Sequence, residues 1–146
     1  MSDLLQTLLA AAGNYHGEGV NHEGEAFTCT VSLTALFGKA ALLAFSARTA
    51  QGINLHQEHG LIVPAAPGQV SMTSVNSNMP FAQDWSGAMD LPGLIRFSHG
   101  DMNLNTGFRE ILTLDCSGGD AQRIAFAWAM PGQAIAARSS ATLSRS

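Results

Sequence analysis

GINLHQEHGLIV, at Gly52–Val63, brings His56, Glu58 and His59 within four residues of one another. On a helix the two histidines would lie one turn apart and could share a metal ion, whereas on a strand they face opposite sides. The aliphatic residues and the proline at 61–64 favour a strand. We therefore predict a strand, reject a two-histidine metal site, and place His56 and Glu58 on one face.

The pair formed by His56 and Glu58 has three interpretations. It stabilises a barrel wall or contacts a ligand, it lies on the surface, or it is the acid–base pair of an enzyme. No nucleophile is identifiable beside it, which weakens the catalytic interpretation. The sequence favours the structural or ligand-contacting role.

Most of the remaining chain alternates between short runs with strand character and turn signals. The turns recur every eight to twelve residues, for example at Gln51-Gly52, Pro67-Gly68, Pro92-Gly93 and Pro131-Gly132. About ten strands at this spacing predict an all-β fold, either a sandwich or a closed antiparallel barrel. We favour the barrel because closure removes edge strands, which a weakly charged surface cannot protect.

A short helix is expected before the strands. Leucines at positions 4, 5, 8 and 9 recur at helical spacing, and Gly13 follows them as a stop. A chain of 146 residues fits one domain, which we assign to residues 1–146.

The composition excludes several classes of protein. A net charge of −4 with seven Lys and Arg gives no basic stripe for nucleic acid. No segment reaches the roughly 18 apolar residues of a membrane helix, and Asp3 stands where a signal peptide carries Lys or Arg. We therefore expect a soluble, cytoplasmic protein with Cys29 and Cys116 as reduced, buried thiols. Charged residues make up only 12% of the chain, against about 25% in most soluble domains, which is a hint of a homodimer.

Two strands near the C-terminus are candidates for lining a cavity. In RIAFAWAM, at 123–130, Trp128 shares a face with other large side chains, and the opposite face carries alanines. Both faces are apolar, so one can pack a core while the other lines a cavity or an interface. In AIAARSSATLS, at 134–144, Arg138 and Ser140 share one face. If that face turns inward, Arg138 is a charge inside a barrel that requires an anionic partner.

Two motifs point to a known family. The first is Gly-x-Trp-x-Gly-x-Gly, matched with tyrosine in place of tryptophan by Gly13, Tyr15, Gly17 and Gly19. These glycines also suit close backbone approach in a barrel strand. The second is Arg-(Thr/Asp)…Gly…His-x-Glu-x-Gly, matched by Arg48, Thr49, Gly52, His56, Glu58 and Gly60. Together with the order of the other strands, they make the chain resemble the nitrobindin group of fatty-acid-binding-protein-like (calycin) barrels over nearly its whole length.

The resemblance implies a ten-stranded antiparallel barrel around a small-molecule cavity. In nitrobindins a histidine on the last strands ligates haem iron, but this chain has no histidine after His99. Arg138, Ser139 or Ser140 lies near the place of that ligand, and none of them is a good ligand for haem iron. Fatty-acid-binding relatives hold a carboxylate with an arginine from the last strands. Arg138 would suit that role by bidentate hydrogen bonding, with Arg109 as a second candidate.

Three functions remain open. The favoured one is a non-enzymatic barrel that binds a small apolar or amphipathic ligand, including an acid held by Arg138. Its candidate ligand contacts are Tyr15, His56, Glu58, Arg109, Trp128, Arg138 and Ser140. The second is a haem protein that uses His56, His59 or His99 as the iron ligand. The third is an enzyme in which His56 and Glu58 act as acid and base.

Overall fold

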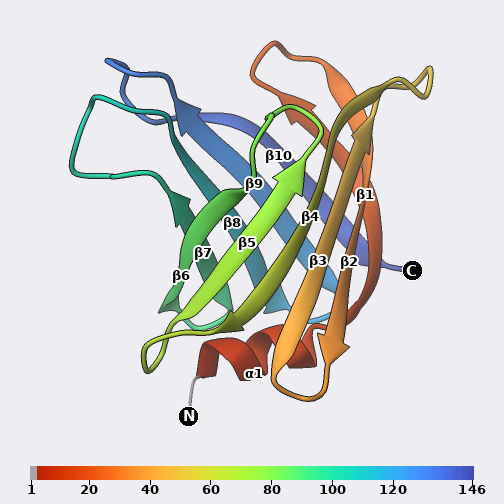
Figure 1. Ribbon diagram of the computed structural model, residues 1–146. Helices are drawn as coiled ribbons and strands as arrows, with labels where there is room; N and C mark the ends of the chain where they lie inside the picture. The colour runs from red at the N-terminus through yellow and green to blue at the C-terminus, as the bar shows by residue number, and fades with distance from the viewer. Residues whose placement is uncertain (1–2) are drawn as a thin grey trace.

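Residues 3–146, which the structure describes, form one short helix and ten antiparallel strands that close into a barrel in this computed structural model (Figure 1). The elements are α1 (Asp3–Ala10), β1 (Gly13–Asn21), β2 (Ala26–Leu36), β3 (Ala40–Arg48), β4 (Asn54–Pro64), β5 (Val70–Asn76), β6 (Gln83–Leu91), β7 (Leu94–His99), β8 (Arg109–Gly118), β9 (Ala121–Ala129) and β10 (Ala136–Arg145). Each strand pairs with its neighbour in sequence, and β1 closes the barrel by pairing with β10. The predicted closed barrel with a short N-terminal helix is confirmed.

Closure brings the backbones of β1 and β10 close together. A Cβ atom at Gly17 would lie 1.9 Å from the carbonyl oxygen of Thr142, and one at Gly19 would lie 2.2 Å from that of Ser140. A side chain at either position would therefore overlap the partner backbone, and only glycine fits. The predicted close backbone approach at these two glycines is confirmed.

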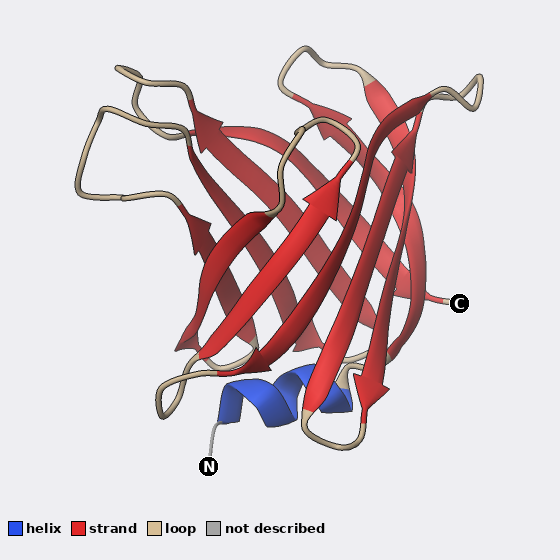
Figure 2. Cartoon of the chain, in the orientation of Figure 1, coloured by secondary structure: helices blue, strands red, loops and turns tan. Residues whose placement is uncertain are grey.

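The helix α1 lies across one end of the barrel (Figure 2). The side chains of Leu4 and Leu8 are buried against the interior, as the helical spacing of the leucines predicts. Apolar side chains fill the barrel, including Val31, Leu43, Ile62, Met72, Ile95, Leu112, Ile124 and Leu143. Among the described residues, no helix is long and apolar enough to span a membrane.

The histidines His56 and His59 both lie on the strand β4. Burial alternates along the strand, so Glu58 and Ile62 point inward with His56, whereas His59 is exposed on the outer face. A strand was predicted here, and it places the two histidines on opposite sides of the barrel wall. In the sheet, Glu58 is paired with Phe45 of β3 on one side and with Asn76 of β5 on the other.

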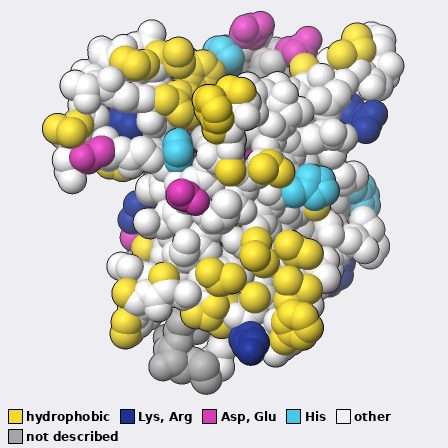
Figure 3. Space-filling view, in the orientation of Figure 1, with side chains coloured by type: hydrophobic (Ala, Val, Ile, Leu, Met, Phe, Trp, Pro, Cys, Tyr) yellow, Lys and Arg dark blue, Asp and Glu magenta, His cyan; other side chains and the backbone are white. Residues whose placement is uncertain are grey.

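Part of the outer wall is apolar as well. Leu42 of β3 is paired with Leu61 of β4, and both are partly exposed, as is Val63. Figure 3 shows hydrophobic side chains gathered on the lower half of this side of the barrel. Few charged side chains interrupt them, in keeping with the low charge content of the sequence.

Candidate functional site

A cavity of about 230 Å³ lies at the end of the barrel away from α1. Aromatic rings form much of its wall: Phe27, Phe45, Phe126 and Trp128. Its polar or charged side chains include His22, His56, Glu110 and Arg138. These residues sit in the β1–β2 turn and near the ends of the strands that are remote from the helix, so residues far apart in sequence converge on one space.

A second pocket of about 250 Å³ adjoins the first. His56, Glu110 and Trp128 line both pockets and so form a shared wall. The second pocket adds Phe108 and Met130 from the segments that flank β8 and β9. The open end of the barrel therefore holds two compartments that meet at an imidazole, a carboxylate and an indole.

The side chain of Arg138 stacks on Trp128 at the wall of the first pocket. Its guanidinium carbon lies 4.1 Å from the centroid of the indole ring, and its Nε donates to the carbonyl oxygen of Trp128 at 3.2 Å. This cation–π contact and the hydrogen bond hold the guanidinium in place. No carboxylate of the described residues lies within 4.0 Å of the guanidinium nitrogens.

The prediction that Arg138 and Ser140 share one face of the last strand is wrong. A β-bulge in β10 shifts its register against β9 at Arg138, and one extra residue exchanges the two faces of a strand. Beyond the bulge, Ser139 lies opposite the inward-facing Phe126 and lines the cavity. Ser140 precedes the buried Ala141 and therefore faces outward.

His56 is held by hydrogen bonds at both ring nitrogens. Its Nδ1 lies 2.8 Å from Nδ2 of Asn78, and the same amide nitrogen donates to the carbonyl oxygen of Leu55 at 3.0 Å. Because the amide is a donor, Nδ1 must accept, which assigns the proton of the neutral ring to Nε2. The Nε2–H group donates to Oε1 of Glu58 at 2.8 Å. The pair singled out in the sequence is thus brought together inside the barrel, with no ring nitrogen left free.

Glu58 is 1% exposed and is hydrogen-bonded through both oxygens. Its second oxygen, Oε2, accepts from the hydroxyl of Ser74 at 2.6 Å. The same hydroxyl accepts from Nε1–H of Trp85 at 2.9 Å. A buried carboxylate is tolerated where its oxygens find donors, and each oxygen of Glu58 has one, so Glu58 serves to fix His56 and the wall behind it.

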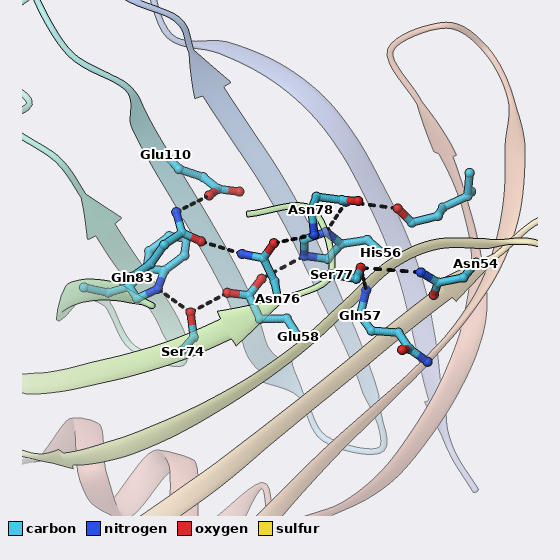
Figure 4. A network of polar contacts seen from close by, with 12 residues as sticks. Asn54, His56, Gln57, Glu58, Ser74, Asn76, Ser77, Asn78, Gln83 and Glu110 are labelled. Carbon is cyan, nitrogen blue, oxygen red and sulfur yellow. Dashed lines mark hydrogen bonds and ion pairs between the residues drawn. The ribbon is translucent and has the colours of Figure 1, made fainter. Parts of the chain in front are cut away.

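Glu110 is a second buried carboxylate, and it lines both pockets. It is 7% exposed, and its Oε1 accepts from the side-chain amide of Gln83 at 3.2 Å. The side-chain oxygen of Gln83 in turn accepts from the side-chain amide of Asn76 at 2.6 Å. The side-chain oxygen of Asn76 accepts from the backbone N–H of Asn78 at 2.9 Å. Figure 4 shows the resulting chain of contacts from Glu110 to His56 and Glu58. Burial raises the pKa of Glu110 above its usual range, and the nearby Glu58 carboxylate raises it further.

Glu110 and Gln83 escaped the sequence interpretation. Glu110 did carry a signal, because it shares an alternating face with Leu112 and Leu114, both of which are buried. A charge on an otherwise apolar inward face marks a cavity more often than a core. Gln83 carried a similar signal, because it shares an alternating face of β6 with the buried Trp85.

Arg109 does not line either pocket. It lies opposite Ala129 on the face of β8 turned away from Glu110, and it is 5% exposed. Its guanidinium donates to the carbonyl oxygens of Gly107 at 3.1 Å and Met130 at 3.2 Å, and also to that of Gln133. The carbonyl acceptors come from the loops on either side, so Arg109 holds these loops together rather than facing the cavity.

Tyr15 lies at the helix end of the barrel, away from the cavity. Its ring is 1% exposed, and its hydroxyl donates to the carbonyl oxygen of Ala11 at 2.8 Å. Burial raises the pKa of this hydroxyl. Tyr15 thus ties the segment after α1 to β1, and it lines neither pocket.

Among the described residues, none of the three histidines predicted as alternative haem ligands presents an unpaired ring nitrogen to either pocket. Both nitrogens of His56 are hydrogen-bonded, and His59 is exposed on the outer wall. His99 donates Nδ1–H to the carbonyl oxygen of Asp84 at 2.8 Å and does not line either pocket. Its ring packs between Trp85 and Phe108, with centroids 5.6 and 6.1 Å away. Within residues 3–146, no group of three or more His, Cys, Asp or Glu side chains is placed to hold a metal ion.

Comparison with known proteins identifies the fold. No protein-family model and no curated protein matches the sequence. Among solved structures, Rv2717c from M. tuberculosis superposes with a TM-score of 0.73 at 18% identity, over 97% of this chain and 96% of that one. A de novo designed fluorescence-activating β-barrel gives a TM-score of 0.50 at 14% identity, over all of both chains. At these identities the similarity shows a shared closed-barrel fold.

Proposed function

We propose that this barrel binds a small amphipathic acid, with the carboxylate on Arg138 and the apolar part against the aromatic wall of the first pocket. The observation that carries the proposal is the guanidinium of Arg138, stacked 4.1 Å above Trp128 inside an apolar cavity. Only its Nε–H has a hydrogen-bond partner among the described residues. The terminal nitrogens therefore remain to donate to a ligand.

An arginine in this setting is suited to bind a carboxylate. Its planar fork matches the two oxygens of the acid, and the indole beneath it lowers the entropy that is lost on binding. The low dielectric of an aromatic pocket strengthens the attraction between opposite charges. A cavity of about 230 Å³ is smaller than the clefts of about 300–1,000 Å³ that hold drug-sized ligands. A single-ring or short-chain acid is therefore the size of ligand to test.

The geometry of His56 argues against the acid–base alternative. A general base must present a free lone pair to its substrate, but Nδ1 of His56 accepts from Asn78 and Nε2 donates to Glu58. A proton transfer would first have to break one of these bonds. Because both ring nitrogens are hydrogen-bonded, His56 acts as a fixed part of the cavity wall.

We place the chain near the nitrobindin-like and fatty-acid-binding-protein-like calycin barrels as part of this proposal. The closed ten-stranded barrel and the glycines at the β1–β10 contact support that placement. The chain departs from the nitrobindin pattern on its last strand, where Arg138 stands near the haem-ligand position. Acid binding fits this departure better than haem ligation, because an arginine cannot supply a lone pair to iron.

Isothermal titration calorimetry of matched acids and alcohols tests the proposal. The probes are para-toluate against para-methylbenzyl alcohol, and hexanoate against hexanol. We expect at least one acid to bind more tightly than its alcohol and Arg138→Gln to weaken that acid by about tenfold or more, the usual loss for a charge-assisted hydrogen bond. Arg123→Gln, an exposed arginine on the same sheet, is the control. Equal affinity of every acid and its alcohol, or acid binding unaffected by Arg138→Gln, would overturn the proposal.

A further inference from the structure

Two opposite charges line the first pocket without pairing with each other. Arg138 and Glu110 both contribute to its wall, yet no ion pair joins them among the described residues. Buried charges are costly and normally pair within the protein. A cavity that keeps a cation and an anion apart is complementary to a ligand that carries both.

We propose that the ligand is zwitterionic, with its carboxylate on Arg138 and an ammonium group on Glu110 where the two pockets meet. This inference rests on the proposed function and adds to it the chemical class of the ligand. It assigns Glu110 as the residue that selects amino acids and related aminocarboxylates over simple acids.

The hydrogen bonds of Glu110 leave one oxygen for a ligand. Gln83 donates to Oε1, and the orientation of that amide is fixed because its own oxygen accepts from Asn76. Oε2 has no hydrogen-bond partner among the described residues, although the side chain is only 7% exposed. Glu110 lines both pockets and its unpaired Oε2 is not completely buried, so open space lies beside this carboxylate.

The surroundings of the second pocket favour a cation. Trp128 and Phe108 contribute aromatic rings to its lining, and Met79 and Met130 contribute thioethers. Aromatic faces beside a carboxylate attract ammonium groups by the cation–π effect and by charge. The described residues place no Lys, Arg or His nitrogen within 4.0 Å of the Glu110 carboxylate to compete for it.

The charged and titratable neighbours of Glu110 define how pH acts on this site. Glu58 and His56 face it from β4, and His99 lies opposite it on β7. Arg138 and His22 line the first pocket with it. Burial keeps the pKa of Glu110 above 4.5. A bound ammonium stabilises the carboxylate, so amine affinity is expected to fall as the pH drops and Glu110 takes up a proton.

Calorimetry with matched ring compounds measures separately how the carboxylate and the ammonium group of a ligand contribute to its affinity. The probes are para- and meta-(aminomethyl)benzoate, which carry both charges, para-toluate, which carries the acid alone, and para-methylbenzylamine, which carries the amine alone. We expect one zwitterion to bind about tenfold more tightly than the acid. In Glu110→Gln this advantage should shrink to within about twofold, because the ammonium loses its partner. Para-toluate should bind at least as tightly as before, because the variant removes a negative charge from the same pocket. Glu18→Gln, an exposed glutamate on the outer face of β1, is the control that should keep the full advantage.

The outcomes distinguish this inference from the proposed function. If para-toluate binds through Arg138 but neither zwitterion gains over it, or the gain survives Glu110→Gln, the zwitterion inference is overturned and acid binding stands. If no acid binds, the proposed function fails, and the zwitterion inference fails with it. Binding of para-methylbenzylamine that Glu110→Gln abolishes would then show a cation site alone. Thermal unfolding of each variant confirms that it is folded before titration.

Discussion

Replacing Ser74 by alanine is expected to destabilise the barrel far more than the loss of one hydroxyl suggests. Ser74 is 1% exposed and sits between Glu58 and Trp85. It donates to Oε2 of Glu58 at 2.6 Å and accepts from the indole N–H of Trp85 at 2.9 Å. Alanine at this position would leave a buried carboxylate oxygen and a buried N–H without partners.

The magnitude follows from the cost of these two orphaned groups. A buried neutral donor without a partner costs about 1–3 kcal/mol, and a hydrogen bond to a charged group is worth about 1.5–3 kcal/mol. Trp85 is 2% exposed and Glu58 1%, so water cannot replace either contact without a rearrangement. We expect Ser74→Ala to lower the free energy of unfolding by about 3–5 kcal/mol, among the larger effects of a single substitution.

Urea unfolding followed by tryptophan fluorescence measures this loss, and calorimetry should show a Tm lower by about 10–15 °C. Ser86→Ala, on the exposed face of β6, is the matched control and should change stability by less than about 0.5 kcal/mol. In a Trp85→Phe background the indole N–H is already gone. Ser74→Ala should then cost about 1–2 kcal/mol less than in the wild type.

Two results would refute the reasoning behind this prediction. A loss below about 1 kcal/mol on Ser74→Ala would mean that the hydroxyl carries no buried charge-assisted contact. An equal loss in the wild-type and Trp85→Phe backgrounds would mean that Ser74 and Trp85 are not coupled. Either result would also remove the support that fixes Glu58, and hence His56, in the cavity wall.

Two further predictions follow from the pKa shifts. Burial raises the pKa of Glu110 above 4.5, so its ionised form disfavours folding at neutral pH, and this penalty disappears as the pH falls through the raised pKa to 4.5. Glu110→Gln should therefore raise Tm at pH 7 and lose that advantage near pH 4.5; calorimetry showing a constant difference at both pH values would contradict this. Burial also raises the pKa of Cys29 and of Cys116 to about 11, so neither thiol should react with iodoacetamide at pH 7.5 until the protein is unfolded, as mass spectrometry would show.

The barrel was predictable because its signals are local. Strand periodicity, turn residues and helical leucine spacing each depend on a few neighbouring residues. The close backbone approach at Gly17 and Gly19 was also predictable, since a glycine within a strand often marks such an approach. The pairing of His56 with Glu58 followed from the same two-residue period.

The polar part of the cavity was harder to predict because it depends on contacts between distant strands. Ser74, Asn78 and Gln83 become partners of the cavity residues only through the register of β4, β5 and β6 and the loop after β5. The bulge at Arg138 exchanged the faces of the last strand, which moved Ser140 outward. Arg109 was the second candidate for holding a carboxylate because of the resemblance to fatty-acid-binding proteins, but carbonyl groups of two loops accept its hydrogen bonds.

The placement of polar residues along single strands explains how the barrel accommodates an unpaired charge. On β8 the cavity residue Glu110 is followed on the same face by the buried Leu112 and Leu114. On β4 the inward face passes from Glu58 to the buried Ile62 toward the end covered by α1. The helix end thus contributes apolar burial, which dominates folding stability, whereas the open end carries the groups that destabilise the folded state. Substitutions at the helix end should therefore alter stability, whereas those at the open end, such as Glu110→Gln, should alter ligand selection as well as stability.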